Sequence, residues 1–221
     1  MPETVAQGPA KAERTRAAIL AAAERLFARQ GYAATRLEDV ADAVGVKRAA
    51  LFYHFRDKQA LYDAVIEEAF SGLVARIEAA LAAGGPVGPR AEAAVEEWVD
   101  AVEQRPALAR LILRHAADAE ERPATPLFPA AQRLLRTAWA LFEEGRRSGE
   151  LQPLHDDPFH AASALIGATV FYVSALAPLL PFGDFDPLAP EQIAAHKRDA
   201  LRTARRLLGI GAPRRARRRP R

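Results

Sequence analysis

Apolar residues recur every three or four positions along most of the chain, a period typical of amphipathic α-helices. In the first such stretch, residues 11–30, Lys, Arg and Glu occupy the face opposite an apolar stripe. That stripe consists of Ile19, Ala22, Ala23, Leu26 and Phe27. Few stretches alternate strictly between apolar and polar residues, as half-buried strands do. The pattern therefore predicts an all-α protein without a sheet.

Two signals separate the first helix from the second. Gly31 follows the first helix, at a position where glycine takes a left-handed backbone without steric cost. Thr35 and Glu38 have the spacing of a capping box, in which each side chain bonds the backbone amide of the other. We therefore expect a second helix over residues 36–44.

Residues 36–55 have the form of a helix-turn-helix, with Gly45 in the turn and a third helix over 47–55. Leu51 and Phe55 are expected to pack inward. The outward face combines cations, a phenol and small residues: Lys47, Arg48, Ala50, Tyr53 and His54, with Lys58 one turn further. A helix fits the major groove, which is about 12 Å wide, and cations and hydroxyls suit phosphate oxygens. Each feature alone is more often core or solvated surface, so the ordered series carries the hypothesis of DNA binding.

The rest of the chain also has helical periodicity. A long helix is expected over 57–83, ended by the Gly- and Pro-rich stretch 84–89. Five more helices are expected over residues 90–104, 106–118, 127–147, 157–177 and 190–208, with a loop over 178–190. The stretch 84–89 is a candidate hinge for a swing of the long helix, or a simple connector.

Residues 15–62 resemble the N-terminal domain of the TetR/AcrR family of transcriptional regulators. The residues that carry the resemblance are Ile19, Leu20, Leu26, Phe27, Gly31, Tyr32, Thr35, Val40, Ala41, Val44, Gly45, Val46, Leu51, Phe52, Tyr53, His54, Phe55, Lys58, Gln59, Ala60 and Leu61. The resemblance implies an all-helical homodimer. Each subunit would carry a three-helix DNA-binding domain and a larger domain that binds a small effector and forms the dimer.

The resemblance implies a domain organisation and a function. Residues 11–58 would bind operator DNA, residues 59–210 would bind the effector and dimerise, and 211–221 would be a basic, disordered tail. The protein would be a repressor that a small apolar or aromatic molecule releases from its operator. Two alternatives stay open: a helix-turn-helix protein without an effector, and, less favoured, an all-helical enzyme.

The family pattern also implies the DNA-contacting residues. They are Thr35, Arg36, Lys47, Arg48, Ala49, Ala50, Phe52, Tyr53, His54 and Lys58. The last three match the family well at positions that commonly touch phosphate, whereas Thr35 and Arg36 are candidates through the start of the second helix. Lys47 replaces the usual Ser or Thr, Ala49 a frequent glycine, Ala50 a frequent threonine and Phe52 a frequent tyrosine. These departures bear on the base preference more than on DNA binding itself.

In the family, the last two helices form the dimer interface, and they correspond here to 157–177 and 190–208. The first is rich in Ala, Gly and Ser, which permit close helix approach, and an isolated chain would leave it partly exposed. The alternative is ordinary core within one subunit. An effector pocket is expected among the helices after residue 90. Its candidate lining residues are Trp98, His115, Phe128, Trp139, Phe142, Phe159 and Tyr172, although such residues are more often plain core than pocket lining.

Metal and enzyme chemistry are weakly represented. His155, Asp156, Asp157 and His160 could ligate zinc or nickel, but helix capping by the aspartates explains them as well. We therefore expect neither a metal nor a cofactor. The sequence lacks cysteine, which excludes disulfides, thiolate metal sites and a cysteine nucleophile. It also lacks the common phosphate-loop, metalloprotease and serine-hydrolase motifs, so we expect no enzyme.

Charge is unevenly distributed in a chain whose formal net charge is +3. Residues 1–62 carry +3, residues 63–211 carry −6 and residues 212–221 carry +6, so the ends are expected to meet a polyanion.

The N-terminal residues have no apolar segment typical of a signal peptide, which predicts a cytoplasmic protein. Residues 161–183 lack charge, but two prolines and several small polar residues favour a buried helix over a membrane span.

Overall fold

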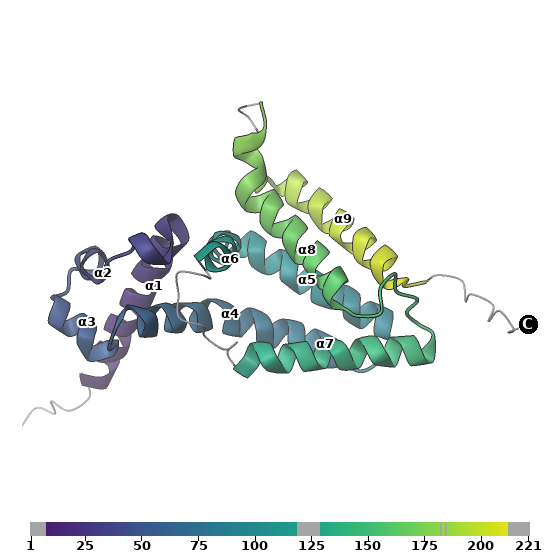
Figure 1. The fold of residues 1–221 in the computed structure, drawn as a ribbon, viewed down its shortest axis with the longest axis horizontal. Coiled ribbons are helices and arrows are strands. Elements are labelled where there is room, and N and C mark those ends of the chain that lie inside the picture. The colour runs from purple at the N-terminus through teal and green to yellow at the C-terminus, as the bar shows by residue number, and fades with distance from the viewer. Residues whose placement is uncertain (1–7, 119–128, 182, 184, 212–221) are drawn as a thin grey trace, which may run out of the picture. The chain divides into compact units, whose positions relative to one another are not determined.

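The structure is a computed structural model that describes residues 8–118, 129–181, 183 and 185–211. These residues form helices and no strand, as the sequence predicted (Figure 1). In chain order the α-helices are α1 (Gly8–Ala34), α2 (Leu37–Val44), α3 (Arg48–His54), α4 (Lys58–Ala82), α5 (Val87–Gln104), α6 (Ala107–Ala117), α7 (Pro129–Ser148), α8 (Phe159–Phe171) and α9 (Pro190–Leu208). They belong to two compact units, residues 1–70 with 110–126 and residues 71–109 with 127–221.

The division between the two units falls within α4 and within α6. The first unit includes the first half of α4 and most of α6. Hydrogen bonds and ring stacking join α6 to the other helices of this unit. The hydroxyl of Tyr62 lies 2.9 Å from Nδ1 of His115, and the two rings stack. The backbone N–H of Tyr32 donates to Oδ2 of Asp118 at 2.6 Å. Most of α6 is thus part of the unit that holds the helix-turn-helix.

The first unit has a small apolar core. Its fully buried side chains include Ile19, Phe27, Val40, Leu51, Leu61, Tyr62 and Val65. The rings of Phe27 and Tyr62 meet edge to face, with centroids 4.9 Å apart, a favourable aromatic geometry. Leu51 and Phe55 are both buried, so the predicted inward face of the third helix is confirmed.

Gly31 breaks the long first helix, as the sequence predicted. Its φ of 82° and ψ of 177° lie in a region that residues with a side chain rarely adopt. A Cβ at this position would lie 2.9 Å from Oδ2 of Asp118. The glycine is therefore required both by the backbone conformation and by the close approach of Asp118.

The capping box predicted at Thr35 and Glu38 is wrong by one residue. Thr35 is buried, and its hydroxyl donates to the backbone carbonyl of Gly31 at 2.7 Å. Arg36 is the N-cap of α2, and its backbone N–H donates to Oδ2 of Asp39 at 3.3 Å. At the break in α1, the Thr35 hydroxyl thus bonds the carbonyl of Gly31 instead of capping α2.

The turn between α2 and α3 depends on Gly45. Its φ of 73° and ψ of 31° are left-handed, and the backbone N–H of Val46 donates to the carbonyl of Ala41 at 3.0 Å. This is the Schellman arrangement that ends many helices. It holds α3 at a fixed angle to α2, so the helix-turn-helix predicted from the sequence is confirmed.

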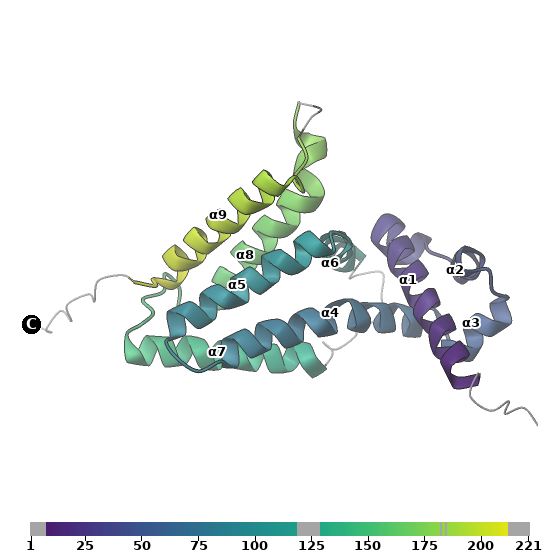
Figure 2. The ribbon, with the colours of Figure 1, turned by 180° about the vertical axis from the view of Figure 1, so that it is seen from behind.

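In the second unit, α5 packs against α7, α8 and α9 (Figure 2). One buried cluster joins the end of α4 to α5, α7 and the segment after α7; its members are Leu81, Val87, Ala91, Ala94, Leu141, Phe142 and Leu151. Ion pairs surround it, including Arg90–Glu144 at 2.9 Å and Arg205–Glu92 at 2.7 Å. The periodic apolar stripes of these helices thus meet in a single core.

The connection between α4 and α5 is tightly held. The guanidinium of Arg90 donates twice to the carbonyl of Leu81, at 2.6 and 3.0 Å, and pairs with Glu144. Oε2 of Glu150 accepts the backbone N–H of Val87 at 2.7 Å. Helix α5 begins at Val87, earlier than the predicted residue 90. Helix α5 therefore includes residues 87–89 of the candidate hinge at 84–89, and these hydrogen bonds fix the connection between α4 and α5.

Helix α8 is apolar yet largely exposed within the single chain. It continues through a π-helical turn, Tyr172–Leu176, and a 3₁₀ turn, Ala177–Leu179. In the described part of the chain, Phe159–Leu179 is the one stretch long and apolar enough to cross a membrane, by length and composition alone; its mean hydropathy is 1.7 and only 17% of it is buried. The expectation that an isolated chain leaves this stretch partly exposed is confirmed.

Candidate DNA-binding surface and ligand pocket

The outward face of α3 presents the side chains expected there. Tyr53 is 81% exposed, and Lys47, Arg48 and Ala49 are exposed beside it. Phe52 is 40% exposed, and the half-buried His54 lies edge-on to Tyr53 with ring centroids 5.1 Å apart. A short, rigid helix with a projecting phenol, two cations and a small exposed alanine has the chemistry to reach phosphates and base edges.

Arg48 does not stand free on this face. Its Nη1 lies 2.8 Å from Oε1 of Glu38 on α2, and its guanidinium lies over the ring of Phe52, 5.3 Å from the centroid. Both charged side chains are about half exposed, so the pair adds little to stability. Its consequence is electrostatic, because a carboxylate accompanies the cation that would approach DNA.

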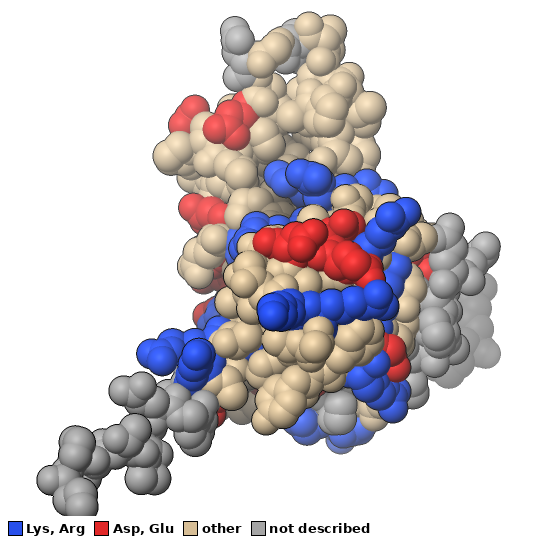
Figure 3. Space-filling view, turned by 90° about the vertical axis from the view of Figure 1, so that its left-hand side faces the viewer, with Lys and Arg blue, Asp and Glu red and all other residues tan. Residues whose placement is uncertain are grey.

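Sequence reasoning missed the acidic residues beside the recognition helix. Glu38, Asp39 and Asp42 of α2 are all exposed. Figure 3, which views this side of the molecule, shows acidic side chains grouped between basic ones. The signal was present in the sequence as three acids within one turn and a half of the second helix. Glu38 was considered only as a cap, so its pairing with Arg48 was not foreseen.

Replacement of Glu38 by glutamine should strengthen binding to DNA about three- to tenfold at low salt, because it removes a negative charge and frees Arg48. The gain should shrink as salt is raised, because exposed charges are screened. Fluorescence anisotropy with a promoter fragment at two salt concentrations measures it. Glu67→Gln, on the exposed side of α4, makes the same charge change as a control. Equal gains from both substitutions would show that only net charge matters.

Two of the expected DNA-contacting residues have partners inside the first unit. Thr35 is buried, so its side chain is not presented to phosphate. Nζ of Lys58 donates to the carbonyl of Ala33 at 2.9 Å and lies 4.4 Å from the ring centroid of Tyr32. Burial lowers the pKa of Lys58, and the charge of Asp118 opposes that shift. Lys58 therefore binds the end of α1 with one of its three N–H donors.

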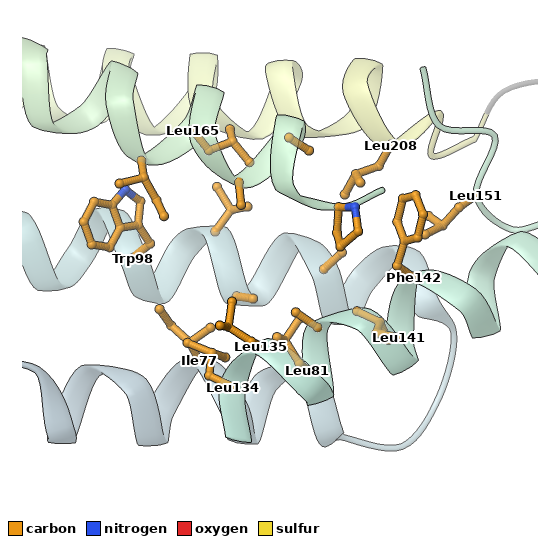
Figure 4. A pocket seen from close by; sticks show the side chains of 18 residues that line it. Ile77, Leu81, Trp98, Leu134, Leu135, Leu141, Phe142, Leu151, Leu165 and Leu208 are labelled. Atoms are coloured by element: carbon orange, nitrogen blue, oxygen red, sulfur yellow. The ribbon is translucent and has the colours of Figure 1, made fainter. Parts of the chain in front are cut away.

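The second unit contains an apolar pocket of about 240 Å³ (Figure 4). Its walls come from α4, α5, α7, α8 and the end of α9; the lining residues are Ile77, Leu81, Ala91, Ala94, Val95, Trp98, Leu134, Leu135, Ala138, Leu141, Phe142, Leu151, Pro158, Ala161, Ala162, Leu165, Ile166 and Leu208. Within the described part of the chain, no charged side chain lines it. Such a space suits a small apolar ligand.

The structure gathers only part of the expected effector-binding set. Trp98 and Phe142 line the pocket. His115 lies in the other unit against Tyr62, and Trp139 packs on Phe159 at a ring distance of 5.7 Å outside the pocket, both rings being about half exposed. Phe128 lies outside the described residues. Most of the lining is aliphatic, and its only signal in the sequence was the inward stripe of each helix.

Tyr172, the remaining candidate, connects α8 to α9. Its hydroxyl donates to Oε1 of Gln192 at 3.0 Å, and its ring stacks on His196 with centroids 4.4 Å apart. The hydroxyl of Thr169 donates to the carbonyl of Leu165, so it accepts from Nε2 of His196 at 3.0 Å. Burial lowers the pKa of His196, which favours the neutral imidazole. Tyr172 lines a separate hollow of about 320 Å³ and not the apolar pocket.

The possible metal cluster is used for helix capping. Oδ1 of Asp157 accepts the backbone N–H groups of Phe159 and His160, at 2.8 and 3.3 Å, at the start of α8. Asp156 pairs with Arg146 at 3.3 Å. The imidazole of His160 contacts Asp157 and stacks on His155. Within the described residues, no group of three or more His, Asp or Glu side chains could hold a metal ion.

Sequence comparison places the helix-turn-helix unit in a known family. The family model described as "Bacterial regulatory proteins, tetR family" matches residues 19–65. The chain is 44% identical over 57 residues to the HTH-type transcriptional regulator TtgR of Pseudomonas putida, covering 26% of this chain and 27% of TtgR. It is 28% identical over 159 residues to the regulator RutR of Escherichia coli, covering 70% and 72%. The match to TtgR thus spans about a quarter of that relative.

Solved structures share the fold over most of the chain. The structure of AibR in complex with isovaleryl coenzyme A and operator DNA has a TM-score of 0.65 and 16% identity, covering 85% of this chain and 96% of AibR. A TetR family regulator from Marinobacter aquaeolei has a TM-score of 0.64 and 20% identity, covering 88% and 97%. The helix-turn-helix unit is thus that of the TetR family of transcriptional regulators, and the solved structures show that most of the chain shares their helical fold.

Proposed function

We propose that the protein is a dimeric DNA-binding repressor that a small apolar or aromatic molecule releases from its operator. The observation that carries this function is the outward face of α3: a rigid helix, fixed by the Gly45 turn, whose exposed side chains include an 81% exposed tyrosine, Tyr53. A helix presented in this way enters the major groove in helix-turn-helix proteins.

The residues of this face divide into two roles. Arg36, at the start of α2, and Tyr53 and His54, at the end of α3, hold phosphates and set the position of the helix. Lys47, Arg48 and Phe52 read base edges, and Ala49 and Ala50 let the α3 backbone come close. A bidentate contact from Arg48 to guanine requires the guanidinium to separate from Glu38. The phosphates that line the groove favour this separation, because they attract the guanidinium and repel the carboxylate.

Lys58 contributes to both fold and DNA contact, because its ammonium has two N–H donors beyond the one given to Ala33. Lys58→Ala should weaken operator binding evenly across sequences and lower the slope of log affinity against log salt by about one. It should also lower the melting temperature, because the end of α1 loses its partner. Anisotropy titrations at several salt concentrations and a thermal melt measure both. A lower melting temperature with an unchanged slope would restrict Lys58 to its structural role.

The dimer is proposed to form through α8 and α9, as expected from residues 157–177 and 190–208. Helix α8 exposes small and apolar side chains that do not line the apolar pocket, namely Ala164, Gly167, Ala168 and Phe171. Large exposed apolar patches mark interaction sites, and small residues permit close approach of helices. A second copy of the same helix pair would cover these side chains and present two α3 helices to one duplex.

The apolar pocket supports release by a ligand. A ligand that fits the pocket better in one dimer arrangement than in another shifts the protein toward that arrangement. If that arrangement separates the two α3 helices beyond one helical turn, operator affinity falls. AibR, which shares this fold, was solved in complex with both isovaleryl coenzyme A and operator DNA.

A cytoplasmic location fits the role of a DNA-binding repressor. The basic tail, which begins at residue 211, lies almost entirely outside the described residues and adds attraction to phosphate.

Footprinting of the purified full chain on the promoter of its own gene tests the proposal. We expect protection of one short palindromic site, lost when a small apolar ligand is added. No protection on that promoter or on DNA selected from random sequence would contradict DNA binding. Protection unaffected by any ligand that raises the melting temperature would contradict release by an effector.

A further inference from the structure

One side chain that lines the apolar pocket carries a buried polar group without a partner within the described residues. Trp98, on α5, lines the pocket and is only 7% exposed, and its indole Nε1–H is buried without a hydrogen bond. Figure 4 shows the indole at one end of the pocket, with its nitrogen on the edge nearer α8. A buried indole N–H usually finds a partner, because an unmade hydrogen bond costs free energy.

The other lining side chains offer no compensation for a charged ligand. All of them are aliphatic, aromatic or proline side chains, and the nearby ion pairs are already formed, as with Arg90 and Glu144. Burying an unpaired carboxylate or ammonium in such surroundings is strongly unfavourable. The same surroundings favour apolar carbon, since each methylene group that leaves water contributes to binding.

From these two observations we propose that the ligand of this pocket is a neutral, mostly apolar molecule carrying one hydrogen-bond acceptor oxygen, such as a ketone or an ester. Its oxygen accepts the indole N–H of Trp98, while its hydrocarbon part fills the space between Leu81, Leu134 and Leu165. The pocket volume of about 240 Å³ limits the ligand to a small molecule. This inference rests on the proposed effector-binding function and specifies its ligand class.

Three probes with the same number of carbon atoms test the inference: butyrophenone, butylbenzene and 4-phenylbutyrate, which are a ketone, a hydrocarbon and a carboxylate. Calorimetric titration of the full chain should give a Kd for the ketone about tenfold lower than for the hydrocarbon, the effect of one hydrogen bond, and weakest binding for the carboxylate. Trp98→Phe keeps an aromatic ring and removes the N–H, so it should abolish the ketone's advantage. Trp139→Phe, at a 42% exposed tryptophan outside the pocket, should leave the advantage intact.

The outcomes separate this inference from the function on which it rests. Equal binding of ketone and hydrocarbon by the unmodified protein, or an advantage that survives Trp98→Phe, would overturn the role of Trp98 while leaving an apolar effector site. Tightest binding of the carboxylate would overturn the neutral ligand class. If Trp98→Phe fails to fold, the ranking of the three probes on the unmodified protein still decides. Failure of all three probes to bind, with operator binding intact, would overturn the inference and the apolar effector proposal but not DNA binding.

Discussion

Phe171→Asp should convert the protein from a dimer to a monomer and weaken operator binding about 10²- to 10⁴-fold, the usual advantage of two linked contacts over one. Phe171 lies on the exposed face of α8 and is 47% exposed in the single chain. In the proposed dimer its ring is buried against the second copy, where an unpaired carboxylate is strongly unfavourable. Sedimentation and anisotropy with operator DNA measure the two effects.

Leu113→Asp provides the matched control for Phe171→Asp. Leu113 is 41% exposed and lies on α6, in the part of that helix that belongs to the first unit. The substitution makes the same apolar-to-acidic change on a surface to which we assign no partner. The dimer should persist in this variant. A Phe171→Asp protein that still sediments as a dimer at micromolar concentration would contradict the α8 interface.

Ala49→Asp should weaken operator binding about a hundredfold while leaving the fold intact, because both subunits lose close approach to base edges and gain a charge that repels phosphate. Ala49 is exposed near the start of α3, where an acidic side chain suits the positive end of the helix. The melting temperature should therefore change little. Anisotropy on the operator and a thermal melt measure the contrast.

Ala21→Asp, on the exposed face of α1, makes the same substitution in a helix outside the proposed groove-facing surface. It should reduce DNA affinity only through the change in net charge, by less than about tenfold. Similar losses for the two variants would mean that α3 has no special position on the DNA. A hundredfold loss confined to Ala49→Asp would support groove insertion.

Much of the fold could be predicted from the sequence because local signals and global packing agree. Gly31 and Gly45 stand where a left-handed backbone is required, and both ended helices as expected. Leu51 and Phe55 lie four residues apart and share the buried face of α3. The periodic apolar patterns of the helices were long and regular, so tertiary contacts changed the helix boundaries by only a few residues.

The details that the sequence could not provide depend on long-range contacts. Thr35 has the right spacing for a cap, but its hydroxyl donates a hydrogen bond to the carbonyl of Gly31 instead. Lys58 reaches back to Ala33, 25 residues earlier, and Asp118 reaches Tyr32 from the end of α6. Nothing local to these residues indicates such partners.

The lining of the pocket was misjudged for a different reason. Periodicity identifies the apolar side of a helix but not the element that covers it. Trp139 and Phe159 were therefore expected to line the pocket, although they pack on each other outside it, while Leu134 and Leu165 line it. The uncharged length of α8 was compatible with core or with an interface, and the structure shows that a single chain leaves it largely exposed.

Methylation protection on the promoter of its own gene tests the central claim, that two copies of α3 enter the major groove of one duplex. The N7 atom of guanine lies in the major groove, so its protection reports a protein side chain there. We expect two clusters of protected guanines, related by a two-fold axis and separated by about 10 base pairs or a multiple of that spacing. Protection confined to minor-groove atoms, or a single cluster without a symmetric partner, would contradict the account.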